Sequence, residues 1–206
     1  MATVTEIAAE AAAASGARSP ADARGWRLFV ALELPHSVRA TLSGWRESAL
    51  SGGGELRAVG RDELHVTLCF LGLCQADSVA AIGRACSVIG GSGRALLRIG
   101  EALWLPRRHP GVLAVAIEDM DGKLAEAQAA LAQSLALIGA YRPEARAFLP
   151  HVTVARVRGR GRARSRDLER PPPVGFEGER VTLYRSVLGG GPDGGSRYEA
   201  LHTVEL

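Results

Sequence analysis

The tripeptide His-Val-Thr occurs twice in this chain, at residues 65–67 and 151–153, each time inside an apolar segment that is typical of a β-strand. An earlier apolar strand precedes each copy at a similar distance: 37 residues separate Leu28 from the first histidine, and 39 separate Val112 from the second. A segment with helical spacing of apolar residues lies between the two strands of each half. Chance similarity of two common strand-helix-strand patterns is the alternative, but the repeated tripeptide favours a duplicated unit.

Further strands and helices are predicted along the chain. Strands are predicted over residues 26–34, 64–71, 112–117, 148–155, 180–188 and 198–205. Helices are predicted over residues 38–49, 77–89 and 121–138. Pro35 ends the first strand, Asp121 is the expected N-cap of the last helix, and Gly139 is its expected C-cap.

The composition is that of a soluble globular chain, with 47% hydrophobic and 23% charged residues among 206. The three cysteines, Cys69, Cys74 and Cys86, match no zinc or redox spacing, so we expect a reducing, cytoplasmic location. No run of 18 apolar residues predicts a membrane span. Residues 1–24 are Ala-rich and lack the basic start of a signal peptide, so we expect a flexible extension there.

The basic residues are almost all arginine, with Lys123 as the sole lysine. The formal net charge of +3 is too small to indicate nucleic-acid binding on its own. Arginines occupy every second position from 156 to 166, directly after the second His-Val-Thr. This segment is either a solvated loop or an electrostatic track that attracts phosphate groups. Codon bias can explain the choice of arginine over lysine, but it does not explain the clustering.

Side chains at positions i and i+2 of a strand share one face. We therefore expect His65 beside Thr67, and His151 beside Thr153, and a pseudo-twofold axis would bring both pairs into one cleft. Two imidazoles can act as acid and base on opposite sides of a phosphorus atom, because the pKa of histidine lies near neutrality. Threonine hydroxyls can donate to phosphate oxygens. The pattern indicates phosphodiester cleavage without a metal, and the residues alone do not fix which histidine is the acid.

Two other kinds of catalytic site fit the sequence less well. A Ser-His-Asp site would need a Gly-x-Ser-x-Gly turn before a helix, and none is present. A zinc site is disfavoured because the two histidines lie 86 residues apart with no carboxylate or cysteine at ligand spacing. Phe29, Trp104 and Tyr184 can stack on a nucleobase, but core packing is the favoured interpretation of each.

These motifs make the chain resemble the two-histidine phosphoesterases, and among them the bacterial RNA 2′,3′-cyclic phosphodiesterases, also called 2′-5′ RNA ligases. The resemblance covers residues 26–206. The segments that carry it are Arg27–Leu32 with Leu34 and Pro35, Leu64–Leu68 with Phe70–Gly72, Pro150–Arg156, and Leu183–Ser186 with Tyr198.

The resemblance implies an α+β, bilobal, duplicated fold with two antiparallel sheets, helices outside, and a central cleft that carries the two His-x-Thr strands. Residues 25–206 would form this single domain, with pseudo-repeats at about 26–90 and 111–156 and closing strands within 174–206. The implied protein acts without a cofactor or metal. We expect a monomer that has no contact with membranes.

The implied reaction opens a 2′,3′-cyclic phosphate to a 2′-phosphomonoester. By resemblance, His65 is the proton donor to the departing 3′ oxygen and His151 is the proton acceptor that activates water. Thr67 and Thr153 would bind phosphate oxygens, and Arg156 matches a phosphate-contacting arginine of the family. In a regular strand, however, Arg156 would lie on the opposite face from His151.

The expected ligands are RNA ends or cyclic-phosphate nucleotides. The same site can in principle run backwards and form a 2′-5′ RNA linkage. Two alternatives stay open at this point: a phosphodiesterase that acts on a small cyclic nucleotide, and a non-catalytic RNA-binding module.

Overall fold

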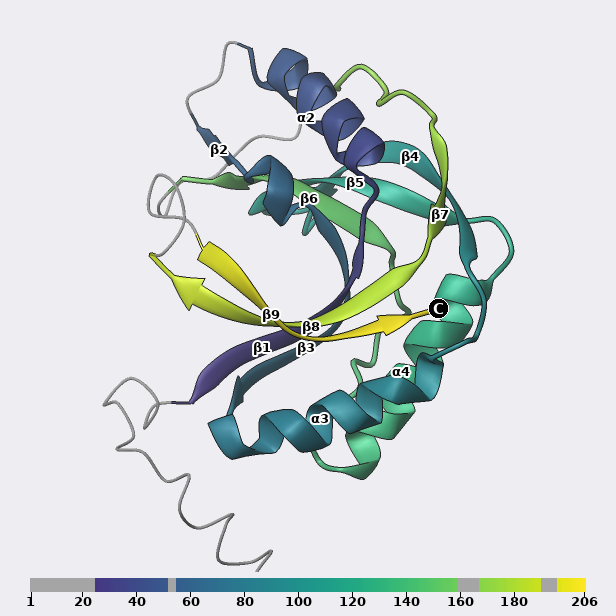
Figure 1. Cartoon of the computed structure of the whole chain (residues 1–206). Helices are drawn as coiled ribbons and strands as arrows, with labels where there is room; N and C mark the ends of the chain where they lie inside the picture. Colours follow the sequence, from purple (N-terminus) through teal and green to yellow (C-terminus); the bar gives the residue numbers. More distant parts are fainter. Residues whose placement is uncertain (1–24, 52–54, 159–166, 190–195) are drawn as a thin grey trace, which may run out of the picture.

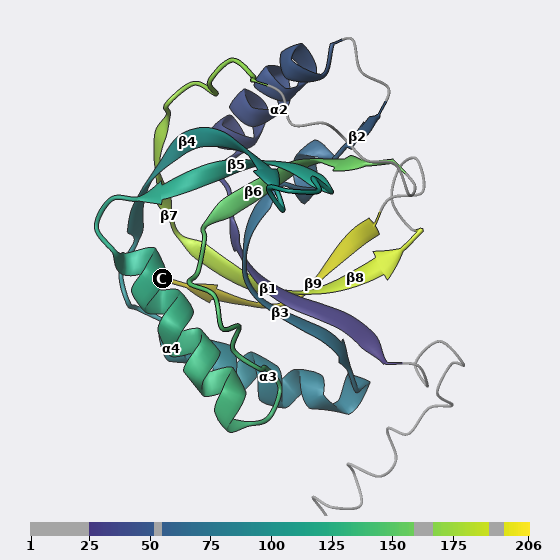
Figure 2. The same cartoon turned by 180° about the vertical axis from the view of Figure 1, so that it is seen from behind.

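The computed structural model describes residues 25–51, 55–158, 167–189 and 196–206 as an α+β protein. The extension expected over residues 1–24 lies outside the described part of the chain. Figures 1 and 2 show two groups of strands that curve about a common centre, with helices on their outer sides. The α+β class predicted from the resemblance is therefore confirmed.

The first group of strands, here called the His65 lobe, is the lower one in Figure 1. Its members are β1 (Trp26–Glu33), β3 (His65–Cys74), β8 (Arg180–Leu188) and β9 (Ser196–Glu205). They pair antiparallel in the order β3-β1-β8-β9. The inner strand β1 is buried on both faces from Leu28 to Leu32, which explains its uninterrupted apolar run.

The second group, here called the His151 lobe, lies above the first in Figure 1. Its members are β4 (Ala95–Leu105), β5 (Val112–Asp119), β6 (His151–Val157) and β7 (Gly175–Gly178), and the short β2 (Leu56–Ala58) pairs with β6. Strands β2, β4 and β7 were not among the predicted elements. Strand β6 begins at His151, three residues later than predicted, and Pro150 lacks the N–H that a ladder hydrogen bond needs.

The two lobes join where β3 meets β6, through the single residue pair Val66 and Val152. This pair makes all nine strands one continuous, strongly curled sheet. The two antiparallel sheets expected from the resemblance are thus present as two antiparallel groups of strands. They are joined by the pairing of β3 with β6, here called the seam. Both valines are fully buried, so the seam is part of the core, and the residues on either side of each valine point to the opposite face.

The helices cross between the lobes. Helix α2 (His36–Leu50) follows β1 in sequence but packs against β6 of the His151 lobe. Helix α4 (Lys123–Leu137) follows β5 and packs against β4 and β5 of its own lobe, but it also packs against β3 and against α3 (Val79–Cys86), which borders β9. Figure 1 shows α2 on one side of the curled sheet and α3 with α4 on the other. Each half of the sequence therefore contributes a helix to the other half.

Short 3-10 turns flank the helices. They are η2 (Arg61–Glu63), η3 (Ala76–Ser78) and η4 (Ser87–Ile89). The single helix predicted over residues 77–89 is consequently divided into η3, α3 and η4. None of the helices in the described part of the chain is long and apolar enough to cross a membrane.

The start of α4 differs from the prediction. Gly122, not Asp121, occupies the N-cap position, with a left-handed φ of 79° that favours glycine. Two carboxylates serve the first turn: Asp119 accepts the N–H groups of Gly122 at 3.1 Å and of Ala125 at 2.9 Å, and Asp121 accepts that of Lys123 at 3.3 Å. At the other end the C-cap is Ile138, not Gly139; Gly139 follows it with a left-handed φ of 71°, the conformation that glycine favours just after a helix.

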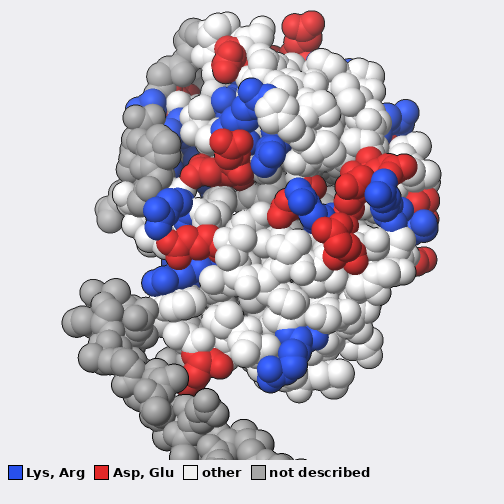
Figure 3. Space-filling model, viewed as in Figure 1, with Lys and Arg blue, Asp and Glu red and all other residues white. Residues whose placement is uncertain are grey.

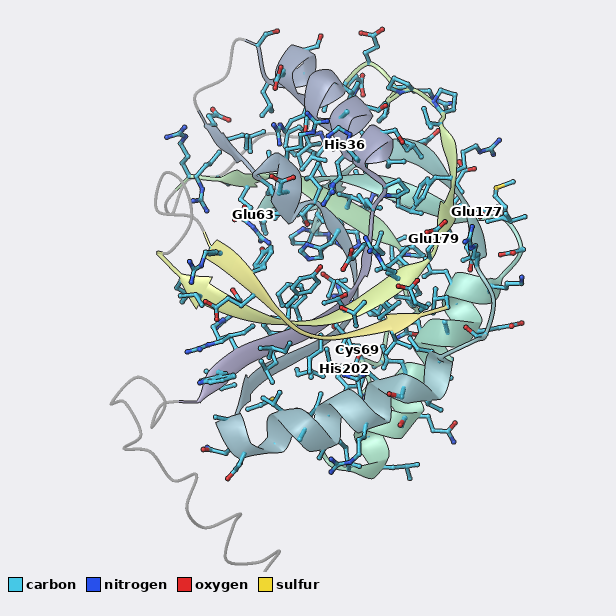
Figure 4. The ribbon with its side chains drawn as sticks, in the orientation of Figure 1. His36, Glu63, Cys69, Glu177, Glu179 and His202 are labelled. Atoms are coloured by element: carbon cyan, nitrogen blue, oxygen red, sulfur yellow. The ribbon has the colours of Figure 1, made fainter. Side chains whose placement is uncertain are left out.

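The cysteines belong to the structural part of the molecule. Cys69 and Cys86 are buried, and burial raises the pKa of each thiol to about 12. Figure 4 shows Cys69 together with His202 beside α3, on the other side of the strands from Glu63. All three cysteines are free thiols. Cys69 and Cys86 therefore act as small apolar core residues.

Candidate active site

The seam between β3 and β6 brings the two His-x-Thr motifs together. In antiparallel register, the pairing of Val66 with Val152 places His65 near Thr153 and Thr67 near His151. The four side chains are half-buried and lie on the face opposite to the core, as the alternation predicted. They share one concave site, here called the two-histidine pocket, which is lined by Val59, Glu63, His65, Thr67, His151, Thr153, Arg156 and Tyr198.

A β-bulge in β6 brings Arg156 to this face. In the ladder with β5, Ala155 pairs with Leu113 and Thr153 pairs with Ala114, so Val154 is an extra residue. Val154 and Ala155 are consequently both buried, and the alternation shifts by one position. Arg156 therefore lies on the same side as Thr153. The regular strand assumed in the sequence analysis would have pointed it away.

A β-bulge also occurs in β3. Against β1, Cys69 pairs with Val30 and Thr67 pairs with Ala31, which leaves Leu68 as the extra residue. The burial pattern over residues 65–70 is the same as that over residues 151–156. Phe70 thus occupies the position in the first motif that Arg156 occupies in the second. The duplication extends to the bulge, but the side chain beyond it differs.

Backbone carbonyls orient both imidazoles in the same way. The Nδ1–H group of His65 donates to the Glu63 carbonyl at 2.7 Å, and that of His151 donates to the Leu149 carbonyl at 2.8 Å. A carbonyl only accepts, so Nδ1 carries the proton in each neutral ring and Nε2 carries the lone pair. The Nε2 atom of His65 lies 3.1 Å from Oγ1 of Thr67, whose hydroxyl can donate to it.

Aromatic rings enclose His65. The ring of Phe29 stacks on the imidazole at 4.9 Å between centroids, and Tyr198 meets the imidazole edge-on at 5.3 Å. Tyr184 stacks on the other side of Phe29 at 5.3 Å, and its hydroxyl donates to Glu33 at 3.1 Å. Burial and the nearby Glu33 carboxylate raise the pKa of Tyr184 to about 12, so the hydroxyl stays protonated.

This enclosure changes the titration of His65. Burial, followed by the positive charge of Arg156 and the proximity of His151, lowers the pKa of His65 to about 4, against the opposing effect of its hydrogen bond to the Glu63 carbonyl. His65 is therefore neutral near pH 7 in the unliganded pocket. A bound anion between the imidazole and Arg156 would favour the protonated ring, because it replaces repulsion by attraction.

All five residues predicted for the site, His65, Thr67, His151, Thr153 and Arg156, line one pocket. The sequence analysis missed three others: Val59, Glu63 and Tyr198. Of these, Tyr198 was quoted only as part of the family resemblance. Its place in the pocket depends on the pairing of β9 with β8, for which the sequence carries no local signal.

The other candidates lie elsewhere. Phe29 and Tyr184 belong to the packing around His65, and Trp104 is half-buried against the core. Arg158, which follows β6, donates through Nε to the Leu56 carbonyl at 3.3 Å. The remaining arginines of the predicted track, at positions 160, 162, 164 and 166, lie outside the described residues. Within the described ranges, no group of three or more His, Cys, Asp or Glu side chains is arranged to hold a metal ion.

Comparison with known proteins identifies relatives of this site. The family model of the 2′-5′ RNA ligase superfamily matches residues 34–190. A crystal structure of a phosphoesterase aligns with a TM-score of 0.74 at 26% identity, over 88% of this chain and 98% of that chain. E. coli LigT complexed with 3′-AMP aligns with a TM-score of 0.73 at 26% identity, over 88% and 98% of the two chains.

A third solved structure, TT0787 of Thermus thermophilus, aligns with a TM-score of 0.67 at 26% identity, over 87% of this chain and 97% of that chain. The search of curated proteins found no match. The family model covers more than half of the chain, and the alignments extend over nearly all of each solved structure. The chain therefore belongs to the 2′-5′ RNA ligase superfamily, within the two-histidine phosphoesterases, and is an enzyme of the phosphoesterase or ligase type.

Proposed function

We propose that this protein hydrolyses the 2′,3′-cyclic phosphate ends of RNA to 2′-phosphomonoesters by two-histidine acid–base catalysis. The observation that carries the proposal is the convergence of two identically oriented imidazoles with two threonine hydroxyls and a guanidinium group in one pocket. Solved structures of LigT contain 3′-AMP, ATP or NADP+. They support a nucleotide or RNA end as the ligand of this chain.

In the proposed reaction, Nε2 of His151 takes a proton from water, and the water oxygen attacks phosphorus. The bond between phosphorus and the 3′ oxygen breaks, and protonated Nε2 of His65 gives its proton to that oxygen. The phosphate stays on the 2′ oxygen. Thr67, Thr153 and Arg156 bind the non-bridging oxygens, on which negative charge develops. Both proton transfers are made by imidazoles, so the proposed reaction needs no metal or cofactor.

The titration of His65 couples this mechanism to substrate binding. A neutral His65 cannot donate a proton, and it is neutral in the unliganded pocket because burial and Arg156 lower its pKa. The anionic cyclic phosphate offsets the charge of Arg156 and therefore raises the pKa of His65. His65 is consequently protonated when the phosphate is bound, and its proton then lies next to the leaving oxygen.

The direct test is incubation of the protein with an oligonucleotide that ends in a 2′,3′-cyclic phosphate. The product is expected to carry a 2′-phosphate, which a phosphatase or ligase specific for one isomer distinguishes from a 3′-phosphate. An unchanged substrate, or a 3′-phosphate product, would contradict the proposal. Supplying an RNA with a 5′-hydroxyl tests the reverse reaction, and we expect hydrolysis to dominate in water.

A salt series separates RNA from a small cyclic nucleotide as the substrate. RNA turnover is expected to fall steeply between about 50 and 200 mM salt (about a 10-fold or larger loss), because each phosphate contact releases counterions. Turnover of a mononucleotide should respond weakly. A protein that binds the oligonucleotide tightly at every salt concentration and never opens the cyclic phosphate would instead be a non-catalytic binding module.

A further inference from the structure

Two arginines stand directly opposite each other at the end of the two-histidine pocket. In the short ladder between β2 and β6, Arg57 is the register partner of Arg156. Direct partners in an antiparallel ladder point to the same face, and like charges in such a pair destabilise the sheet. Since Arg156 lines the pocket, Arg57 lies on the pocket side as well. Its strand neighbour Leu56 is buried on the other face.

No described carboxylate forms an ion pair with either arginine, although many arginines elsewhere are paired. Arg94, for example, lies 2.8 Å from Glu177, and Arg98 and Arg180 also have acidic partners. Figure 3 shows blue and red side chains side by side over much of the face in view. The nearest acidic side chain of the pocket, Glu63, accepts the N–H of Gly60 instead. Among the residues that the structure describes, the two opposed guanidinium groups therefore have no carboxylate as an ion-pair partner.

The hydroxyl of Tyr198 feels the positive charges of both Arg57 and Arg156. Burial and the Glu63 carboxylate raise the pKa of its phenol, while Arg156, through its charge and a hydrogen bond, and the charge of Arg57 act to lower it. Both arginines therefore act electrostatically on the hydroxyl of a residue that lines the pocket. Arg57 is half-buried and Arg156 is exposed, so the pair is open to solvent from the side of Arg156.

We propose that Arg57 forms a second phosphate-binding site for the phosphodiester that links the terminal nucleotide to the rest of the RNA, with the Arg156 guanidinium group shared between that phosphodiester and the cyclic phosphate. The proposal rests on the proposed function and specifies its substrate class as an oligonucleotide end, not a mononucleotide. Arg156 lies about 7 Å along β6 from Thr153, with one bulged residue between them. The arginine pair is thus beside, and not between, the two imidazoles.

The chemistry of the two substrates makes Arg57 the discriminating residue. A nucleoside 2′,3′-cyclic phosphate has one phosphate, and the two-histidine pocket takes it. An oligonucleotide end has a second phosphate on the 5′ side of the same ribose. Guanidinium groups bind such diesters in bidentate fashion, and a phosphate between two arginines replaces their repulsion by attraction. Arg57 should therefore contribute only when the second phosphate is present.

The test compares Arg57→Gln with the wild type on a nucleoside 2′,3′-cyclic phosphate and on a dinucleotide with the same terminal group. We expect kcat/KM for the dinucleotide to fall by about 10- to 100-fold, as for loss of a charge-assisted hydrogen bond, mostly through KM. The mononucleotide value should stay within about twofold. Arg57→Lys should give an intermediate loss, because lysine keeps the positive charge but lacks the planar pair of N–H donors that binds a phosphate in bidentate fashion.

Arg84→Gln is the matched control, because it removes the same charge from an exposed position on α3 and should leave both substrates unchanged. Thermal unfolding of Arg57→Gln without nucleotide provides a second readout. Its midpoint should equal or exceed that of the wild type, because a like-charge pair is lost. Equal losses on both substrates with a lowered midpoint would show a structural role for Arg57 and overturn the proposal. Unchanged kinetics would overturn it too.

A binding measurement separates failure of this proposal from failure of the proposed function. Calorimetry gives the affinity for a nucleoside 2′-phosphate and for a dinucleotide with a terminal 2′-phosphate, and needs no turnover. We expect the wild type to prefer the dinucleotide and Arg57→Gln to lose that preference. If the wild type opens no cyclic phosphate but shows this pattern, the proposed reaction fails and the second phosphate site stands. If it is active without the pattern, only the second site fails.

Discussion

The two halves of the site are built by the same local devices but placed in different surroundings. Each histidine donates its Nδ1–H to the carbonyl two residues earlier, has a threonine two residues later, and is followed by a bulge. Around His65, however, Phe29 and Tyr198 exclude water, whereas His151 is not among the residues with a described ring contact. The His-x-Thr strands thus fix the geometry, and the other strands of the His65 lobe fix the proton affinity of His65.

The comparison shows how two copies of one motif can come to differ in proton affinity. Two copies of one strand have no such difference of their own. The difference comes from β1, β8 and β9, which bring the aromatic rings to His65 only. We therefore expect substitution of either histidine to lower the rate to a similar extent. Substitutions in the residues around His65 should affect the proton affinity of His65 alone.

The largest effect is expected from the histidines themselves. His65→Ala and His151→Ala should each lower kcat on a 2′,3′-cyclic-phosphate oligonucleotide by about 10²- to 10⁴-fold, because each removes one proton transfer. Binding of the oligonucleotide should largely survive. His109→Ala, at an exposed position, is the control. If either pocket variant keeps a rate close to the wild type, the two halves do not share the reaction as proposed.

The second largest effect concerns the dependence of stability on pH. The pKa of His65 is lowered from 6.5 to about 4, so the unfolded chain binds the proton more readily. Its contribution to stability is present above pH 6.5 and is lost as the pH falls towards 4, by about 3 kcal/mol at most. Denaturant unfolding of the wild type and His65→Gln at several pH values measures this. Between pH 6.5 and 4, the free energy of unfolding of the variant should fall less with pH than that of the wild type. An identical pH dependence in the two proteins would refute the claim that burial lowers the pKa of His65.

Substitution of the two threonines tests whether both halves of the site bind the phosphate, with a smaller expected effect than substitution of the histidines. Thr67→Val and Thr153→Val keep the shape of the side chain and remove the hydroxyl, so each should lower kcat/KM by about 10- to 100-fold through loss of a hydrogen bond to the charged phosphate. Thr67 also contacts His65 at 3.1 Å, so its variant should in addition alter the pH profile. An effect of only one threonine would show that the phosphate is held by one lobe.

The smallest expected effect is that of metal removal. Incubation with a chelator should leave the hydrolysis rate unchanged, because the proposed proton transfers use imidazoles alone. The assay is the same oligonucleotide opening with and without the chelator. Loss of activity that a divalent ion restores would replace the two-histidine mechanism by a metal-assisted one.

The sequence predicted which of the pocket residues share a face of their strand, because that signal is local. Alternation on a strand places His65 with Thr67 and His151 with Thr153, and it needs no knowledge of the rest of the fold. The lobed architecture came from the family resemblance. Strands β2 and β7 were missed because they have three and four residues, too few for a periodic pattern to be recognised.

The N-cap of α4 shows a different limit. Asp121 satisfied the preference for an acidic N-cap, but two aspartates and a glycine lie within four residues there. Both carboxylates accept N–H groups at the start of the helix, Asp119 from Gly122 and Ala125 and Asp121 from Lys123. The reach of Asp119 to Ala125 depends on where β5 ends, and β5 runs to Asp119, so strand pairing contributes to the cap along with capping preference.

By itself, the sequence determined which side chains share a face, because histidine and threonine on alternate strand positions point the same way in any sheet. It could not decide the side of Arg156, since a bulge depends on the register with the neighbouring strand. Nor could it pair Arg57 with Arg156 or enclose His65 with Tyr198, because these contacts join residues about 100 or more positions apart. Only tertiary structure makes such contacts, and here they set the charge and the proton affinity of the pocket.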